Sequence, residues 1–176
     1  MEVILIRHTS VDVPRGTCYG QTDVPVAATF AEEAAATKRN LEQYGKIDKA
    51  YSSPLTRARR LAAFCGYVDA ETDERLLELS MGDWEMQRYD DIKDPYIKEW
   101  HNDYLHLPTP NGESFVEQRK RVSRFLDELK GKPYSRVAIF AHGGVLACAG
   151  IYGGLYPMET AWDNLTPYGG IIRIEI

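Results

Sequence analysis

Four basic side chains follow apolar runs that are typical of buried β-strands: Arg7, His8, Arg57 and His142. In an open α/β sheet, ligands bind beyond the carboxyl ends of the strands, so we expect these side chains at one edge of a sheet. Arginine offers forked, permanently charged donors that match the oxygens of a phosphoryl group. The backbone N–H groups of Gly143 and Gly144, at the expected start of a helix, would add further donors. The sequence therefore predicts a pocket for a tetrahedral dianion such as phosphate.

Each of these residues, taken alone, also has an ordinary structural explanation. A single histidine can be a satisfied core residue, and a single arginine at a surface is usually solvated. The coincidence of two histidines and two arginines after three apolar runs favours the functional interpretation over the structural one.

The elements expected to position these residues alternate along the chain. Apolar, β-branched runs predict strands over 2–6, 47–52 and 137–140, of the type that is buried on both faces of a parallel sheet. Helical spacing and terminal glycines or prolines predict helices over four segments: 29–45, 54–66, 114–131 and 143–152. Two of these helices are expected to begin with a capping box: Thr29-x-x-Glu32 and Ser114-x-x-Glu117.

A last alternating run, 170–176, predicts an edge strand. This order indicates an α/β fold: a three-layer sandwich with a mostly parallel central sheet, helices on both faces and an antiparallel edge strand. No repeat or linker interrupts the pattern, so we expect a single domain over residues 1–176. The region of about 84–110 differs, because prolines interrupt its polar and aromatic residues, and we interpret it as a small inserted lid.

The expected lid is rich in aromatic residues: Trp84, Tyr89, Tyr96, Trp100 and Tyr104. Their faces could stack on a flat heterocycle, or the rings could form the lid's own small core, and the sequence leaves both readings open. His101 and His106 lie in the same region but lack the spacing of metal ligands, so we interpret them as surface residues.

Composition argues against several classes of protein. The 176 residues include 21 Lys and Arg against 26 Asp and Glu, and a net charge of −5 disfavours a non-specific binder of nucleic acid or anionic membrane. Cys18, Cys65 and Cys148 form no C-x-x-C motif, which argues against a disulfide framework and a structural zinc site. The apolar start is shorter than the hydrophobic part of a signal peptide, and no run is long enough to span a membrane, so we expect a cytoplasmic protein.

Four motifs together resemble, in the right order, those of the histidine phosphatase, or phosphoglycerate-mutase-like, superfamily. The motifs are Leu5–Thr9, Ser52–Ala58, Gly112–Ser114 and Ala141–Gly144. Within the superfamily, the segment Gly16–Pro25 is similar to the branch that removes the 5′-phosphate from α-ribazole phosphate in the assembly of the cobalamin nucleotide loop.

The resemblance implies a role for each basic residue. His8 would attack phosphorus in line and form a phosphohistidine, which water then hydrolyses. Arg7, Arg57 and His142 would hold the phosphoryl oxygens, so that neither a metal nor another cofactor is needed. Glu78 lies in a stretch that resembles the family's Leu-x-Glu…Gly-x-Trp-Glu and would be the acid that protonates the departing oxygen.

Two other carboxylates compete with Glu78 for the acid role, Asp83 and Glu85, although Glu85 could instead position a loop. Leucines next to Glu78 would partly desolvate its carboxyl group, which favours the protonated form. We expect further substrate contacts from four residues: Tyr19, Gln21, Thr22 and Gly143.

The sequence departs from the wider family near the expected site. Val11 and Pro14 stand where mutase-type members have a hydroxyl residue and an asparagine. The missing asparagine removes one donor from the phosphate side. Either Ser10, Gln21 or Thr22 compensates, or the pocket recognises its substrate differently.

Other functions compete with an α-ribazole phosphatase. A phosphoglycerate mutase or a broad sugar-phosphate phosphatase would share the chemistry, but a mutase needs a second anion pocket and the expected lid is acidic and aromatic. An inactive module could bind a phosphorylated ligand without any chemistry. A zinc hydrolase could use two histidines and a glutamate, but Arg7 and Arg57 would repel a cation. The expected partner is a small phosphorylated substrate, not nucleic acid or membrane, and a homo-oligomer is neither predicted nor excluded.

Overall fold

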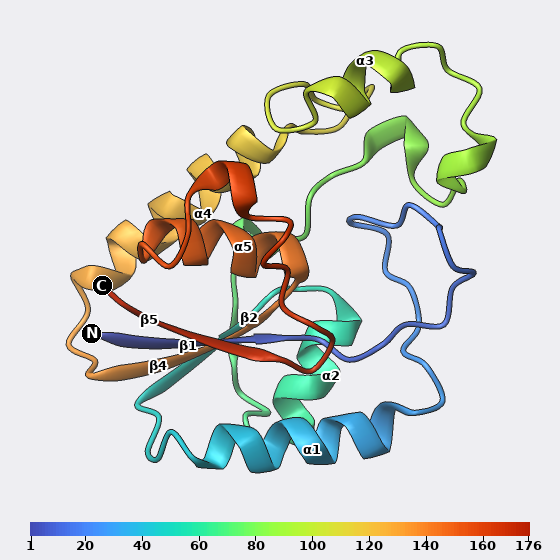
Figure 1. The fold of residues 1–176 in the computed structure, drawn as a ribbon. Coiled ribbons are helices and arrows are strands. Elements are labelled where there is room, and N and C mark those ends of the chain that lie inside the picture. Colours follow the sequence, from blue (N-terminus) through green and yellow to red (C-terminus); the bar gives the residue numbers. More distant parts are fainter.

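A mixed sheet runs through the centre of the molecule, which a computed structural model describes over all residues, 1–176 (Figure 1). The strands are β1 (Glu2–Arg7), β2 (Lys49–Ser52), β3 (Glu71–Thr72), β4 (Arg136–Ala141) and β5 (Ile171–Glu175). They lie in the order β3-β2-β4-β1-β5. The first four strands along the chain are parallel to one another, and β5 is antiparallel to β1. The predicted sheet, mostly parallel with an antiparallel edge strand, is confirmed.

Helices cover both faces of this sheet, which confirms the three-layer sandwich. They are α1 (Phe30–Glu42), α2 (Thr56–Phe64), α4 (Phe115–Lys130) and α5 (Gly143–Tyr152). Helices α1 and α2 cover one face, and α4 and α5 cover the other (Figure 1). No helix combines the length and the apolar surface that a membrane span requires.

Alternate residues of β1 face the two helical layers. Val3 and Leu5 belong to the core beneath α4 and α5, whereas Ile4 and Ile6 belong to the core beneath α1 and α2. All four side chains are at most 1% exposed. Burying one side chain of this size stabilises the fold by roughly 2 kcal/mol. The continuous apolar run therefore reflects burial on both faces of the sheet, as the sequence predicts.

Strands β1, β2 and β4 end at the same level of the sheet. Ser52 of β2 lies opposite Phe140 of β4, and Phe140 lies opposite Ile6 of β1 on its other side. Because these strands are parallel, their carboxyl ends meet at one edge. The residues that leave the sheet there are His8, Ser53 and His142.

Most predicted elements agree with the observed ones to within two residues, and α5 has the predicted bounds. Strand β2 begins at Lys49, later than predicted, and α2 begins at Thr56 because Leu55 is extended, with φ −67° and ψ 138°. Strand β3 was not predicted from the sequence. Its two residues are exposed, so no apolar pattern marks it.

The two predicted capping boxes have different outcomes. At α4, the side chain of Ser114 accepts a hydrogen bond from the N–H of Glu117, and the Glu117 carboxylate accepts one from the N–H of Ser114, as predicted. At α1, the predicted box with Glu32 is wrong. The hydroxyl of Thr29 donates instead to Glu33, at 2.5 Å, and makes no bond to the helix backbone. Glu33 also accepts a hydrogen bond from the loop after β1, and this long-range contact replaces the local cap.

Residues 84–110, the aromatic segment, contain the short helix α3 (Ile97–Asn102) and lie beyond the first turn of α4 (Figure 1). Trp84 and Trp100 are buried, with ring centres 5.5 Å apart, in a small cluster that also includes residues from outside the segment. For these two rings the core interpretation is confirmed. His101 and His106 are exposed, as predicted.

Candidate active site

His8 and His142 lie side by side where β1 and β4 end. Their ring centres are 5.1 Å apart, the rings meet at 62°, and both side chains are buried. The Nδ1 atom of His8 lies 2.7 Å from the carbonyl oxygen of Thr9. Because a carbonyl oxygen can only accept a hydrogen bond, Nδ1 carries the proton, and the lone pair of the neutral ring is on Nε2.

The surroundings keep both imidazoles neutral. Burial, together with the positive charge of Arg57, lowers the pKa of His8 to about 3. Burial also holds the pKa of His142 well below its usual value, and charge on His8 or Arg57 acts in the same direction. The Nε2 atom of His142 is hydrogen-bonded to the hydroxyl of Ser53 at 2.7 Å. His8 is therefore neutral with an unprotonated Nε2, which is the form of histidine that acts as a nucleophile.

The two arginines are held by backbone carbonyls and aromatic rings. Arg57 is fully buried and donates to the carbonyl oxygens of Thr22, at 2.8 Å, and Gly20, at 2.6 Å. Arg7 donates to the carbonyl oxygen of Thr166 at 2.5 Å, and its guanidinium carbon lies 4.1 Å from the centre of the Tyr168 ring. The sheet edge and the surrounding loops thus bring together all four basic residues that the sequence singles out.

Glu78 lies just after a short 3₁₀ helix, Glu74–Leu76, and its carboxylate is hydrogen-bonded on several sides. It accepts hydrogen bonds from the N–H of Leu79 at 2.8 Å, the side-chain amide of Gln118 at 3.0 Å and the N–H of Gly144 at 3.2 Å. These surroundings are more polar than the neighbouring leucines predict, because Leu76 enters the main core while the carboxylate of Glu78 faces the N–H of Gly144 at the start of α5.

The competing carboxylates have other contacts. Glu85 accepts hydrogen bonds from the N–H of Gln21 at 2.8 Å and from the hydroxyl of Thr22 at 2.6 Å, so it holds the loop 19–23 in place. This is the loop-positioning role that the sequence offers as its alternative. Asp83 is exposed and accepts a hydrogen bond from the side-chain amide of Asn111 at 2.8 Å.

The four residues expected to contact substrate are placed differently from one another. Tyr19 lies at the site, with its ring 5.3 Å from the guanidinium carbon of Arg57. Gly143 begins α5 against Arg7, and a Cβ there would be 3.2 Å from the guanidinium carbon. The side chains of Gln21 and Thr22 are engaged within the protein, by the carbonyl oxygen of Glu78 and by Glu85.

Sequence reasoning misses several residues of the site. The ring of Tyr168 lies 5.5 Å from that of His8, and its hydroxyl is 2.8 Å from that of Tyr19. An antiparallel final strand starts at the edge where β1 ends, so the turn before β5 was a signal that could locate Tyr168. Gln118 of α4 carries no comparable signal, because its contact with Glu78 joins residues far apart in the chain.

Two cavities with shared walls lie beside these residues. The smaller, of about 210 Å³, is lined by Arg7, Tyr19 and Glu78 among others. The larger, of about 270 Å³, is lined only by hydrophobic side chains: Leu79, Met81, Tyr89, Trp100, Tyr104 and Trp162. Leu79, Met81, Tyr89 and Trp162 line both cavities. A compartment that Arg7 and Glu78 line together with hydrophobic residues therefore continues into a wholly apolar, largely aromatic one.

The sequence as a whole matches a known family of this architecture. The Histidine phosphatase superfamily (branch 1) matches residues 3–176. This chain belongs to that superfamily. It is accordingly a phosphatase, and the resemblance drawn from its motifs is confirmed.

The names of the relatives of this histidine phosphatase refer to different substrates. A protein of Hydrogenobacter thermophilus named "Putative phosphoserine phosphatase 2" is 30% identical over 98% of this chain and 88% of its own. The "Adenosylcobalamin/alpha-ribazole phosphatase" of Escherichia coli strain K12 is 29% identical over 100% of this chain and 90% of its own. The crystal structure of the alpha-ribazole phosphatase from Shigella flexneri is similar with a TM-score of 0.89, at 28% identity, and covers 100% of this chain and 91% of that one.

Proposed function

We propose that this phosphatase hydrolyses a small phosphomonoester through a covalent intermediate on His8, and that its substrate is α-ribazole 5′-phosphate. One observation carries the proposed mechanism. His8 is neutral, its Nδ1–H is bound by the carbonyl oxygen of Thr9, and charge from Arg57 and Arg7 reaches its ring. This combination supplies a nucleophile and a counter-charge for the phosphoryl group at one place.

The reaction takes two displacements at phosphorus. Nε2 of His8 attacks in line, and the N–P bond forms as the P–O bond to the ribose breaks, while Glu78 gives its proton to the departing oxygen. Glu78, now a carboxylate, then takes a proton from water, whose oxygen displaces His8 and releases inorganic phosphate. Glu78 and Arg7 line the same cavity, which supports this division of roles.

Arg7, Arg57 and His142 hold the phosphoryl oxygens in this proposal. The Nε–H donors of both arginines are buried without a partner in the protein, and Nδ1 of His142 is unpartnered too and is a further donor when the Ser53 hydroxyl donates to Nε2. A buried donor left unpaired costs about 1–3 kcal/mol, which a phosphoryl oxygen would offset. The N-terminus of α5 at Gly143 supports anion binding in addition.

The leaving group occupies the larger cavity, and the aromatic segment, residues 84–110, acts as the lid of a single domain over residues 1–176. Tyr89, Trp100 and Tyr104 of this lid line the cavity, whose walls are entirely hydrophobic. Such walls suit a flat, apolar heterocycle, which can stack on aromatic faces. The nucleoside-like substrate of the relatives from Escherichia coli and Shigella flexneri has this character, which supports its assignment here.

The alternatives fit the cavities less well. Phosphoserine carries a charged amine and a carboxylate, which apolar walls do not satisfy. A phosphoglycerate mutase needs cations for a second phosphoryl group, and the larger cavity contains none in its walls. A zinc hydrolase needs a cluster of ligands, and no three His, Cys, Asp or Glu side chains are grouped to hold a metal.

A panel of phosphomonoesters tests the substrate. We expect kcat/KM for α-ribazole 5′-phosphate to exceed that for phosphoserine, 3-phosphoglycerate and AMP by roughly 10-fold or more. A flat profile would remove the assignment of this substrate and leave the class of reaction intact.

Activity should be unchanged by a chelator, and a requirement for added divalent metal would overturn the mechanism.

Rapid quenching tests the covalent step. With a fast substrate we expect a phosphoenzyme that is stable to base and labile to acid, as a phosphohistidine is, and that is missing from His8→Ala. No phosphoenzyme in the wild type under these conditions would count against covalent catalysis.

A further inference from the structure

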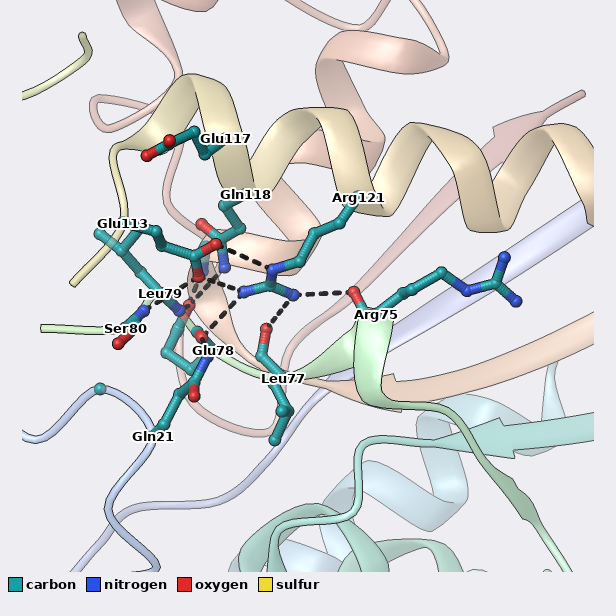
Figure 2. Close-up of polar contacts among 12 residues, drawn as sticks. Gln21, Arg75, Leu77, Glu78, Leu79, Ser80, Glu113, Glu117, Gln118 and Arg121 are labelled. Carbon is teal, nitrogen blue, oxygen red and sulfur yellow. Dashed lines mark hydrogen bonds and ion pairs between the residues drawn. The ribbon is translucent and has the colours of Figure 1, made fainter. Parts of the chain in front are cut away.

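Arg121 projects from the middle of α4 and donates hydrogen bonds to the segment that carries Glu78 (Figure 2). Its Nη1 donates to the carbonyl oxygens of Arg75, at 2.8 Å, and Leu77, at 2.7 Å. Its Nη2 donates to the carbonyl oxygen of Glu78 itself at 2.9 Å. A single guanidinium thus holds the backbone of residues 75–78, which lie outside any strand or α-helix.

Glu113 fixes the guanidinium from the other side. Its carboxylate accepts hydrogen bonds from Nη2 of Arg121 at 2.6 Å and from Nε at 3.1 Å, and both side chains are less than one-fifth exposed. The same carboxylate accepts a hydrogen bond from the N–H of Ser80 at 3.0 Å. The ion pair therefore binds the backbone on both sides of Glu78.

Gln118 acts on the carboxylate of Glu78 directly. It lies three residues before Arg121 on α4, so both side chains project from the same face of the helix (Figure 2). The Gln118 side chain is fully buried, and its amide donates to Oε1 of Glu78 at 3.0 Å. Helix α4 thus holds the backbone of Glu78 with one residue and its carboxylate with another.

We propose that Arg121 is a positioning residue for Glu78, and this rests on the acid role that the proposed function gives to Glu78. An acid that first donates a proton and later accepts one must stay within hydrogen-bond reach of the reacting oxygen. All hydrogen bonds of the Arg121 side chain end on Glu113 or on the carbonyls of this segment, so its geometry serves this segment. A lysine has one point charge and cannot hold three carbonyls and a carboxylate at fixed angles.

The test compares Arg121→Lys with the wild type on two leaving groups. An alkyl phosphate, α-ribazole 5′-phosphate or else ribose 5-phosphate, needs the acid, whereas p-nitrophenyl phosphate releases a stable anion without it. We expect kcat/KM for the alkyl phosphate to fall by roughly 10- to 100-fold, and kcat/KM for p-nitrophenyl phosphate to change by less than about threefold. A merely structural role would lower both alike, and equal losses or no loss would overturn the proposal.

Further variants separate position from folding. In a Glu78→Gln background, Arg121→Lys should lower the alkyl activity by no more than about twofold, because the two residues act through one group. Glu113→Gln keeps its shape and should reproduce the dependence on leaving group more weakly, even where Arg121→Lys folds poorly. Arg124→Lys, exposed on the same helix, is the matched control and should equal the wild type on both substrates.

Failure of the proposed function has a different signature. If the wild type hydrolyses neither substrate, or if His8→Ala retains full activity, the mechanism falls and the role of Arg121 falls with it. If His8→Ala is inactive and Arg121→Lys shows no preference between leaving groups, only the role of Arg121 is overturned.

Discussion

At the scale of single residues, the carbonyl oxygen of Thr9 decides which nitrogen of His8 bears the proton. It accepts from Nδ1, so the lone pair lies on Nε2 without help from a carboxylate. Burial and the neighbouring guanidinium groups keep this ring neutral. In the nucleophilic role that we propose, His8 therefore needs no base to activate it at neutral pH.

The depressed pKa of His8 predicts how stability responds to acid. Between about pH 3, the pKa of the folded state, and 6.5, its ordinary value, the unfolded chain binds a proton that the folded chain does not. Stability therefore rises with pH across this window and is lost as the pH falls through it, by about 1.4 kcal/mol per pH unit for one proton. In urea titrations between about pH 6 and about pH 4, we expect the wild type to lose stability more steeply than His8→Asn. Parallel curves would contradict the shift.

Gly144 is a position where even the addition of a methyl group should disturb the site. A Cβ there would be 2.4 Å from Oε1 of Glu78 and 2.7 Å from Oε1 of Gln118, so both side chains must move. We expect Gly144→Ala to lower kcat/KM by roughly 10-fold or more, because it would misplace the carboxyl group that we propose as the acid. Gly131→Ala is the control, since its Cβ would meet only a carbonyl oxygen at 3.5 Å, and it should keep the activity of the wild type.

At the scale of elements, α4 both closes the core and supports Glu78. Its apolar face lies in the main core, and its Gln118 and Arg121 reach across to the segment after the 3₁₀ helix. The start of such a helix must be well defined, and the capping box at Ser114 provides this.

Two N-caps with different contacts give a matched comparison. Ser114→Ala removes a side chain that caps the backbone of α4, and it should lower the free energy of unfolding by about 1 kcal/mol. Thr29→Ala removes a hydroxyl that makes no bond to the backbone of α1, and it should cost less. Urea denaturation of both variants checks this order, and an equal or larger loss for Thr29→Ala would contradict it.

The elements were predictable where local pattern and burial agree. The buried strands and α5 follow from their apolar runs, because alternate side chains of β1 enter both cores. The cap at Thr29 was not predictable, since a long-range contact to Glu33 decides it. Strand β3 was not predictable either, since exposed residues form it. At the site, strand ends predicted the basic residues, whereas Gln118 and Arg121 depend on contacts between distant segments.

At the scale of the whole molecule, the two cavities join the sheet edge to the aromatic segment. Trp162 lines both of them, and its ring centre lies 5.4 Å from that of Phe115 at the start of α4. It belongs to neither the sheet nor the segment 84–110. The wall between the compartments thus depends on a third part of the chain.

This placement predicts an effect on substrate choice. Loss of one aromatic contact costs about 0.5–1.5 kcal/mol, so Trp162→Ala should raise KM for α-ribazole 5′-phosphate by about 2- to 10-fold. KM for phosphoserine, which has no ring to stack, should change less. Steady-state kinetics with both substrates measures this difference, and equal increases would argue against a leaving group in the larger cavity.

Strand β1 has both of its neighbours, β4 and β5, from the last quarter of the chain. In a nascent chain that has left the ribosome only up to α4, β1, which ends at Arg7 directly before His8, therefore has no partner strand. Pairings between such distant segments form late and slowly. Recovery of activity during refolding should consequently report completion of the whole sheet, well after the local helices have formed.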